Sequence, residues 1–269
     1  MTKIDSFYEF IKQKSLEKGR PLKIISDWDD TMQTYASWVN YEVAKKTIKD
    51  NPTFEYSFEN WSKEQDNIRE QDDIYDQVPF TVAAEELLRA VKENFVKELV
   101  FLTHYNRRRF PGGDKRKQKK IEDTFGSLSE AKTVIHLDTA SNPKPKWIKE
   151  NQPDFDIFID DNPSIISESI KTFSPDKTLV IINQELLYGR VSKLIEADNV
   201  FHLTSKISSI KDTNFRRIER NLLELQEGGS KNYPLLVWSI GVAVFLVLEL
   251  VVIAYLLIRN RKTSKIILK

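Results

Sequence analysis

Short apolar runs recur along residues 1–213, and stretches with helical periodicity separate them. The runs are continuously apolar and rich in β-branched and aromatic side chains, which is the pattern of strands buried on both faces. They occupy residues 22–26, 98–103, 133–137, 155–160, 178–183 and 199–203. Helical spacing of apolar positions follows in residues 82–95, 117–125, 164–173 and 185–195. This alternation predicts an α/β fold with a doubly wound, mostly parallel sheet.

One interval breaks the alternation. Residues 33–78 contain no good strand, although a crossover needs only a dozen or more residues. They carry many charges among the aromatic residues Trp38, Tyr41, Phe54, Tyr56, Phe58 and Trp61. We expect a small helical insertion, and we favour a cap over the active site because insertions at strand ends tend to carry function. A plain helical excursion is the alternative.

The N-terminal segment has no apolar core long enough for a secretory signal. Its apolar residues Ile4, Phe7, Tyr8 and Ile11 recur at helical spacing, which predicts a short amphipathic helix packed on the domain.

The C-terminal segment is different in kind. Residues 234–258 form an apolar run with a single charge, Glu249. A helix rises about 1.5 Å per residue, so roughly 20 apolar residues cross a hydrocarbon core of about 30 Å. We therefore expect one transmembrane helix over 234–258, preceded by a folded domain (1–225) and a linker (226–233) and followed by a basic tail (259–269).

Basic residues lie on both sides of this single-pass anchor, so its orientation in the membrane has to be inferred from more than one feature of the sequence. Basic residues follow the span, which by the positive-inside tendency would keep the tail cytoplasmic, but others precede it closely. Because no export signal precedes the large domain, we expect that domain in the cytosol and a short translocated tail. Glu249 would face a helix of a membrane protein partner or be protonated in lipid.

Charge and cysteine content exclude several classes of function. The chain has 41 basic and 40 acidic side chains, and this balance argues against nucleic acid as a partner. A basic cluster at 107–120 is either a solvated surface or a contact for a second anionic group or an anionic lipid. The absence of cysteine excludes disulfides, thiolate metal sites and cysteine nucleophiles.

Carboxylates gather where the first predicted strand ends. The segment IISDWDDT (24–31) places Asp27 and Asp29 directly after a buried strand, and ligands of open α/β sheets bind outside such carboxyl ends. If the chain bends sharply there, one carboxylate can attack phosphorus while the other serves as general acid and base. A solvated acidic turn is the alternative for this segment alone.

A second acidic pair ends a later strand. Asp160 and Asp161 close the run FDIFID (155–160) and would repel each other unless a cation lay between them. Ligands that are all oxygen suit Mg²⁺. The sequence therefore predicts a magnesium site at this edge of the sheet.

Four segments together resemble the motifs of the haloacid dehalogenase (HAD) superfamily. DWDDT is similar to the DxDxT signature, and ELVFLT resembles the second motif, a strand that ends in Ser or Thr. SNPKPKWIK resembles the segment that supplies the motif lysine, and FDIFIDDNP resembles the acidic fourth motif. The resemblance covers about residues 20–205 and implies a HAD-like Rossmannoid core.

The resemblance also implies roles for individual residues. Asp27 would be the phosphoryl acceptor and Asp29 the general acid and base. Thr103 and a lysine would bind the substrate phosphate, with Lys144 preferred over Lys146 because a proline follows it. The Mg²⁺ ligands would be the carboxylates of Asp27, Asp160 and Asp161 together with the backbone carbonyl of Asp29.

Two hypotheses follow for function. The first is a membrane-anchored, Mg²⁺-dependent phosphatase that hydrolyses a phosphomonoester through an aspartyl phosphate. The second is a catalytically idle, HAD-like membrane scaffold that binds a partner. The phosphorylated substrate has no signature in the sequence.

Overall fold

The computed structural model describes residues 2–50, 58–105, 110, 112–125, 132–138, 143–184 and 194–207. These residues form one seven-stranded sheet with the order β1-β7-β6-β5-β2-β3-β4. Every strand pair in it is parallel. The strands are β1 (Thr2–Ile4), β2 (Leu22–Ser26), β3 (Val96–Tyr105), β4 (Lys132–Asp138), β5 (Ile157–Asp160), β6 (Thr178–Gln184) and β7 (Val200–Ser205).

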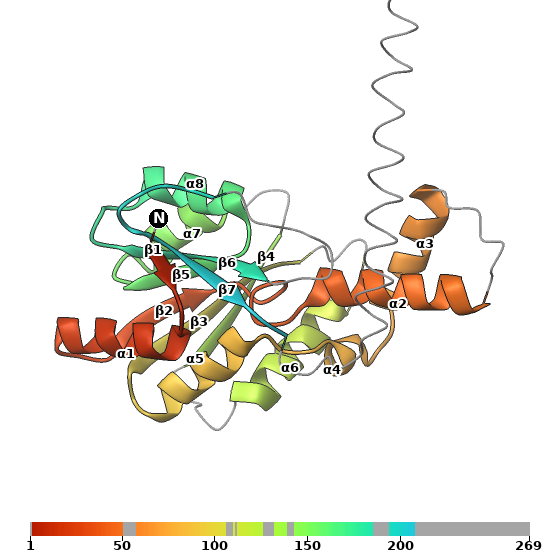
Figure 1. The fold of residues 1–269 in the computed structure, drawn as a ribbon, viewed down its shortest axis with the longest axis horizontal. Helices are drawn as coiled ribbons and strands as arrows, with labels where there is room; N and C mark the ends of the chain where they lie inside the picture. Colours follow the sequence, from red (N-terminus) through yellow and green to blue (C-terminus); the bar gives the residue numbers. More distant parts are fainter. Residues whose placement is uncertain are drawn as a thin grey trace, which may run out of the picture. The chain divides into compact units, whose positions relative to one another are not determined.

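Helices cover both faces of this sheet, so the predicted doubly wound α/β fold is confirmed. Helices α1 and α5 lie on one side of the sheet, and α7 and α8 lie on the other (Figure 1). The helices are α1 (Phe7–Lys18), α2 (Tyr35–Asp50), α3 (Phe58–Arg69), α4 (Ile74–Gln77), α5 (Val82–Lys92), α6 (Gly113–Phe125), α7 (Lys144–Asn151) and α8 (Pro163–Thr172).

All six apolar runs became strands, and the N-terminal prediction needs one correction. Phe7, Tyr8 and Ile11 lie on the buried face of α1, as expected. Ile4, however, belongs to β1, which pairs with β7 at the sheet edge, so its assignment to the helix was wrong. The helix cannot extend back to Ile4 because Ser6 caps it, accepting a hydrogen bond from the amide of Glu9.

The strand order places a topological switch point between β2 and β5. From β2 the chain continues to β3 and β4 on one side, and it later returns to form β5, β6 and β7 on the other. The amide of Asp27 donates to the carbonyl of Ile159 at 2.9 Å, which joins the carboxyl ends of the two strands. Ligands of open α/β sheets bind at such a crevice.

The interval 33–78 contains α2, α3 and α4 and, among its described residues, no strand. The buried side chain of Gln33 connects its two ends. Gln33 accepts a hydrogen bond from Trp28 Nε1 at 2.8 Å and donates to the carbonyls of Tyr75 and Val78, each at 3.0 Å. Helical structure in this interval agrees with the sequence pattern, whereas its role as a cap stays a prediction.

Within the part of the chain that the structure describes, no helix is long and apolar enough to cross a bilayer. Residues 185–193 of the predicted helix at 185–195 lie outside the described residues, as do the linker, the span at 234–258 and the basic tail. Residues 194 and 195 are described and are not helical.

Ion pairs to the buried carboxylate of Asp156 hold the start of β5, at the end of the strand away from Asp160. The Asp156 side chain is only 2% exposed and contacts Arg20 at 2.8 Å and Lys18 at 3.0 Å. It also accepts from the Lys23 amide at 2.8 Å. Burial alone would favour the neutral acid, yet Arg20, the Lys23 amide and Lys18 together lower the pKa of Asp156.

Asp156→Asn is expected to lower the free energy of unfolding at pH 7 by about 1–2 kcal/mol, because it removes the charged acceptor from Arg20, Lys18 and the Lys23 amide. A group with a depressed folded-state pKa stabilises above its unfolded pKa of about 3.9 and loses that contribution as pH falls. Urea unfolding should therefore show the gap between wild type and variant closing below about pH 4.

The matched control is Asp154→Asn, whose side chain is 63% exposed while paired with Lys23. This exposed pair should change stability by less than about 0.5 kcal/mol. A wild-type advantage over Asp156→Asn that persists unchanged at pH 3 would contradict the linkage.

Candidate active site

The chain bends sharply after β2, as the paired carboxylates require. The carbonyl of Trp28 accepts hydrogen bonds from the amides of Thr31 at 3.3 Å, Met32 at 2.8 Å and Gln33 at 3.1 Å. Asp30 has a φ of 55°, a left-handed conformation that Asp tolerates better than most residues. Its carboxylate accepts from the Ala36 amide at 2.9 Å, at the start of α2. This turn sends the side chains of Asp27 and Asp29 to different partners.

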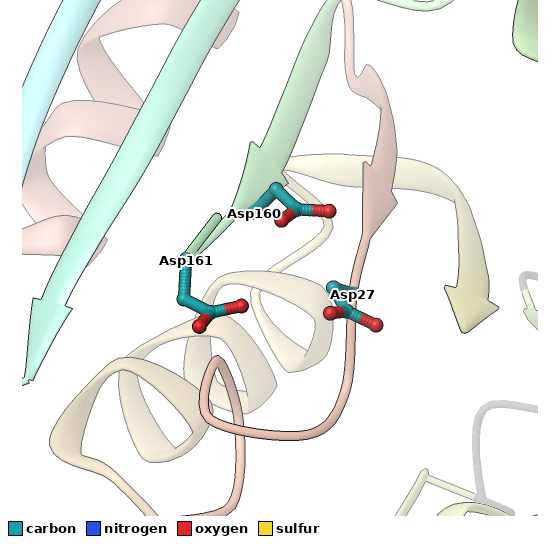
Figure 2. Close-up of side chains that lie close together, drawn as sticks. All are labelled: Asp27, Asp160 and Asp161. Carbon is teal, nitrogen blue, oxygen red and sulfur yellow. The ribbon is translucent and has the colours of Figure 1, made fainter. Parts of the chain in front are cut away.

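Three carboxylates converge at the switch point. Asp27 follows β2, Asp160 ends β5, and Asp161 comes next in the chain (Figure 2). One oxygen from each lies within 4.8 Å of the others. The sequence placed these acids at strand ends, and the structure brings them together.

Lys144 lies between two of these acids. It occupies the first turn of α7 and its side chain is 1% exposed. Its Nζ is 2.9 Å from Asp27 Oδ2 and 2.8 Å from Asp160 Oδ2. Lys146, the alternative, is exposed on the same helix. Geometry thus favours Lys144 as the lysine of the site.

Burial and crowding perturb the ionisation of this cluster. Burial raises the pKa of Asp160 to about 6 against the opposing effect of Lys144. Burial, with repulsion from Asp160, also raises the pKa of Asp161 well above its usual range. For Lys144, burial favours the neutral amine, but Asp160 and Asp27 raise its pKa, so the lysine stays charged. If all three carboxylates are ionised, they carry more negative charge than this lysine balances, and a bound cation would favour their ionised forms.

The donor set fits a hard divalent cation. Asp27 Oδ1 is buried and has no hydrogen-bond partner among the described residues, which makes it an acceptor in need of a positive group. Carboxylate oxygens from Asp27, Asp160 and Asp161 are the ligands that Mg²⁺ prefers. The Asp29 side chain is not part of this group, so Asp29 could contribute only its backbone carbonyl.

Asp29 instead faces a lysine that the sequence analysis missed. Its Oδ2 lies 2.6 Å from Nζ of Lys117 in α6. Burial raises the pKa of the Asp29 carboxyl, and Lys117 acts in the opposite direction. Lys117 also donates to Oγ1 of Thr103 at 3.0 Å, and Thr103 is buried in β3. The structure therefore links two predicted site residues through a third.

One signal in the sequence could have revealed Lys117. It shares a helical stripe with Ile121 and Phe125, at spacings of four residues, and all three are buried. A lysine on an apolar stripe needs a buried partner. The neighbouring lysines of 107–120 obscured that signal.

Among family models, curated proteins and solved structures, only solved structures match the chain. No family model matches it, and no curated protein matches it. Solved structures of HAD-superfamily hydrolases are similar to it. One from Ehrlichia chaffeensis has 14% identity and a TM-score of 0.40, covering 76% of this chain and 98% of its own. One from Geobacter sulfurreducens has 14% identity and a TM-score of 0.41, covering 76% and 96%. A magnesium-bound HAD-hydrolase from Bacillus subtilis has 12% identity and a TM-score of 0.38, covering 68% and 94%. At these identities and scores, function has to be argued from the residues of the site itself.

Proposed function

We propose that this protein is a Mg²⁺-dependent phosphatase that hydrolyses a phosphomonoester through an aspartyl phosphate on Asp27. One observation carries the proposal. Asp27 has one carboxylate oxygen on a buried lysine and the other buried without a partner among the described residues, beside two further carboxylates at a topological switch point. A nucleophile for phosphate needs such an arrangement, because positive charge must offset the repulsion between two anions.

In the first step, a carboxylate oxygen of Asp27 attacks phosphorus in line with the leaving oxygen. The new oxygen–phosphorus bond forms as the bond to the leaving group breaks. Asp27, Asp160 and Asp161 would hold Mg²⁺, which would supply positive charge that lowers the repulsion between the anions. The Lys144 ammonium and the Thr103 hydroxyl stabilise charge on the transferred phosphoryl oxygens.

Asp29 acts as the general acid in the first step and as the general base in the second. It gives its proton to the leaving oxygen, so that the product departs as an alcohol. Its carboxylate then removes a proton from the water that attacks the phosphorus of the aspartyl phosphate. That attack releases inorganic phosphate and regenerates Asp27. The raised pKa of Asp29 suits a group that must carry a proton in one step and lose it in the next.

We also propose that the apolar segment 234–258 holds the protein to a membrane as a single-pass C-terminal anchor, with the catalytic domain in the cytosol. The support is the length of this segment and its single charge. A partner helix in the same membrane would give Glu249 a polar contact.

The full-length protein, purified in mild detergent, tests the proposed activity. It should release phosphate from members of a phosphomonoester panel in Mg²⁺ and lose that activity in EDTA. Acid quenching with ³²P-labelled substrate should trap a label that hydroxylamine removes, as expected of an acyl phosphate. No phosphate release from any ester and no trapped label would overturn the proposal and favour the idle scaffold.

A further inference from the structure

Lys117 is buried completely, and its ammonium group is fully used. Its Nζ contacts Asp29 Oδ2 at 2.6 Å, Thr103 Oγ1 at 3.0 Å and the His104 carbonyl at 3.3 Å. A lysine ammonium has three N–H donors and no acceptor. Three donors therefore meet three acceptors, and none is left over for a substrate. Lys117 can influence chemistry only through the groups it holds.

We propose that Lys117 is a positioning residue that couples the phosphate-binding hydroxyl of Thr103 to the acid/base carboxylate of Asp29. This inference rests on the proposed phosphatase function and assigns a role to a residue that none of the four motif segments contains. Two consequences of the hydrogen-bond geometry support it, one for each partner.

The first consequence concerns the direction of the Thr103 hydroxyl proton. Lys117 cannot accept a hydrogen bond, so Thr103 Oγ1 must be the acceptor in their contact. The hydroxyl hydrogen then points elsewhere. Its acceptor in the structure is the His104 carbonyl at 3.5 Å, at the outer limit for such a bond. A phosphoryl oxygen within reach would accept that hydrogen more strongly. Lys117 thereby makes Thr103 a donor to phosphate.

The second consequence concerns the two oxygens of Asp29. Lys117 holds Oδ2, whereas Oδ1 is buried and has no hydrogen-bond partner among the described residues. A carboxylate fixed through one oxygen presents the other in a constant direction. Asp29 Oδ1 is thus the atom that would exchange the proton with the leaving oxygen and with water.

Two tyrosine rings lie near the Lys117 ammonium, and two ion pairs flank it along α6. The rings of Tyr105 and Tyr75 have centroids 5.3 Å and 5.8 Å from Nζ, within the range of cation–π attraction. On either side of Lys117 along α6, Arg116 contacts Asp72 at 3.0 Å and Lys120 contacts Asp76 at 3.1 Å. The tyrosine rings confine the ammonium group, as a functional group has to be held within a narrow range for catalysis.

The experiment compares two esters in the full-length protein. The leaving group of 4-nitrophenyl phosphate departs without a proton, whereas an alkyl phosphate needs one. Lys117→Met should lower kcat/KM, which reports the steps up to departure of the leaving group, at least about 100-fold on the alkyl ester, the scale of general acid catalysis. On the nitrophenyl ester it should change kcat/KM only a few-fold, because only the contact of Thr103 with phosphate is weakened. The water attack that Asp29 assists is common to both esters and enters kcat but not kcat/KM.

Asp29→Asn should reproduce the dependence of kcat/KM on the leaving group. Asp29→Asn/Lys117→Met should have a kcat/KM on the alkyl ester within a few-fold of that of Asp29→Asn. This double variant also leaves no buried carboxylate unpaired, so it allows the comparison even where Lys117→Met alone fails to fold. Lys117→Arg should restore part of the activity on the alkyl ester. Lys119→Met, at an exposed position of α6, is the matched control and should leave both esters unaffected.

Equal losses of kcat/KM on the two esters would overturn the positioning role alone. So would a double variant whose kcat/KM on the alkyl ester is more than about 10-fold below that of Asp29→Asn. The proposed function fails differently. In that case the wild-type protein hydrolyses neither ester, and the role of Lys117 falls with it.

Discussion

Asp27→Asn is expected to reduce kcat for phosphomonoester hydrolysis by at least about 1000-fold, equivalent to roughly 4 kcal/mol of barrier. An amide has almost the shape of a carboxylate but lacks the electron-rich oxygen that attacks phosphorus. The acid-quenched variant should therefore carry no hydroxylamine-labile phosphate. Steady-state rates and the trapping experiment measure the two effects separately.

The fold should survive this change. The amide side chain of the variant keeps the volume of the carboxylate while removing one of three crowded negative charges, and Lys144 would still pair with Asp160. Unfolding in EDTA should show a stability within about 1 kcal/mol of the wild type. An inactive but unfolded variant would say nothing about the nucleophile, so both measurements are needed.

Asp30→Asn is the matched control, since the same chemical change is made three residues further along. Asn also tolerates the left-handed backbone of Asp30 and can accept the hydrogen bond from the Ala36 amide. Its activity should stay within a few-fold of the wild type. Full activity in Asp27→Asn, or an equal loss in both variants, would remove Asp27 as nucleophile.

The sequence could predict most of the sheet because its strands are apolar on both faces. Runs such as 178–183 can be satisfied only between two layers of helices, which fixes the fold class. The edge strand β1 was not predicted, because three residues are too few to show a strand pattern and Ile4 fits a helical stripe equally well. The strand order also has no local signal, because it depends on long-range packing.

The acidic part of the candidate site could be predicted for a related reason. Asp27 and Asp160 each lie where a buried strand ends, and the carboxyl ends of parallel strands share one edge of the sheet. Lysines are harder to assign, because their long side chains reach a site from helices whose placement the sequence does not encode. Lys144 is buried and Lys146 is exposed, and this difference, seen only in the fold, identifies Lys144 as the lysine of the site. Likewise, only the packing of α6 shows that Lys117 lies beside Asp29.

Lys144→Met is expected to affect both activity and stability. Methionine fills a similar volume but leaves Asp27 and Asp160 buried without their cation. Removing one partner of a buried ion pair costs about 3–5 kcal/mol. For a domain of about 200 residues, this corresponds to a fall in Tm of roughly 10 °C. Loss of a cation beside the phosphoryl group should also lower kcat on the order of 100- to 1000-fold.

Mg²⁺ should distinguish this loss from a general packing defect. If Asp27, Asp160 and Asp161 hold the ion, Mg²⁺ supplies the positive charge that the variant lacks, and binding to the folded state stabilises it. We therefore expect a larger rise in Tm on moving from EDTA to Mg²⁺ for Lys144→Met than for the wild type. Activity should stay low, because Mg²⁺ does not replace the ammonium group at the phosphoryl oxygens.

Lys146→Met provides the control on the same helix. Its side chain is exposed, so the free energy of unfolding should change by no more than about 0.5 kcal/mol, as surface substitutions usually do. Tm and kcat should therefore stay close to the wild-type values. Equal effects of Lys144→Met and Lys146→Met would contradict the assignment of the site lysine. In a contrary outcome, Mg²⁺ raises the Tm of Lys144→Met no more than it raises the Tm of the wild type. That result would show that the three carboxylates do not share a divalent cation.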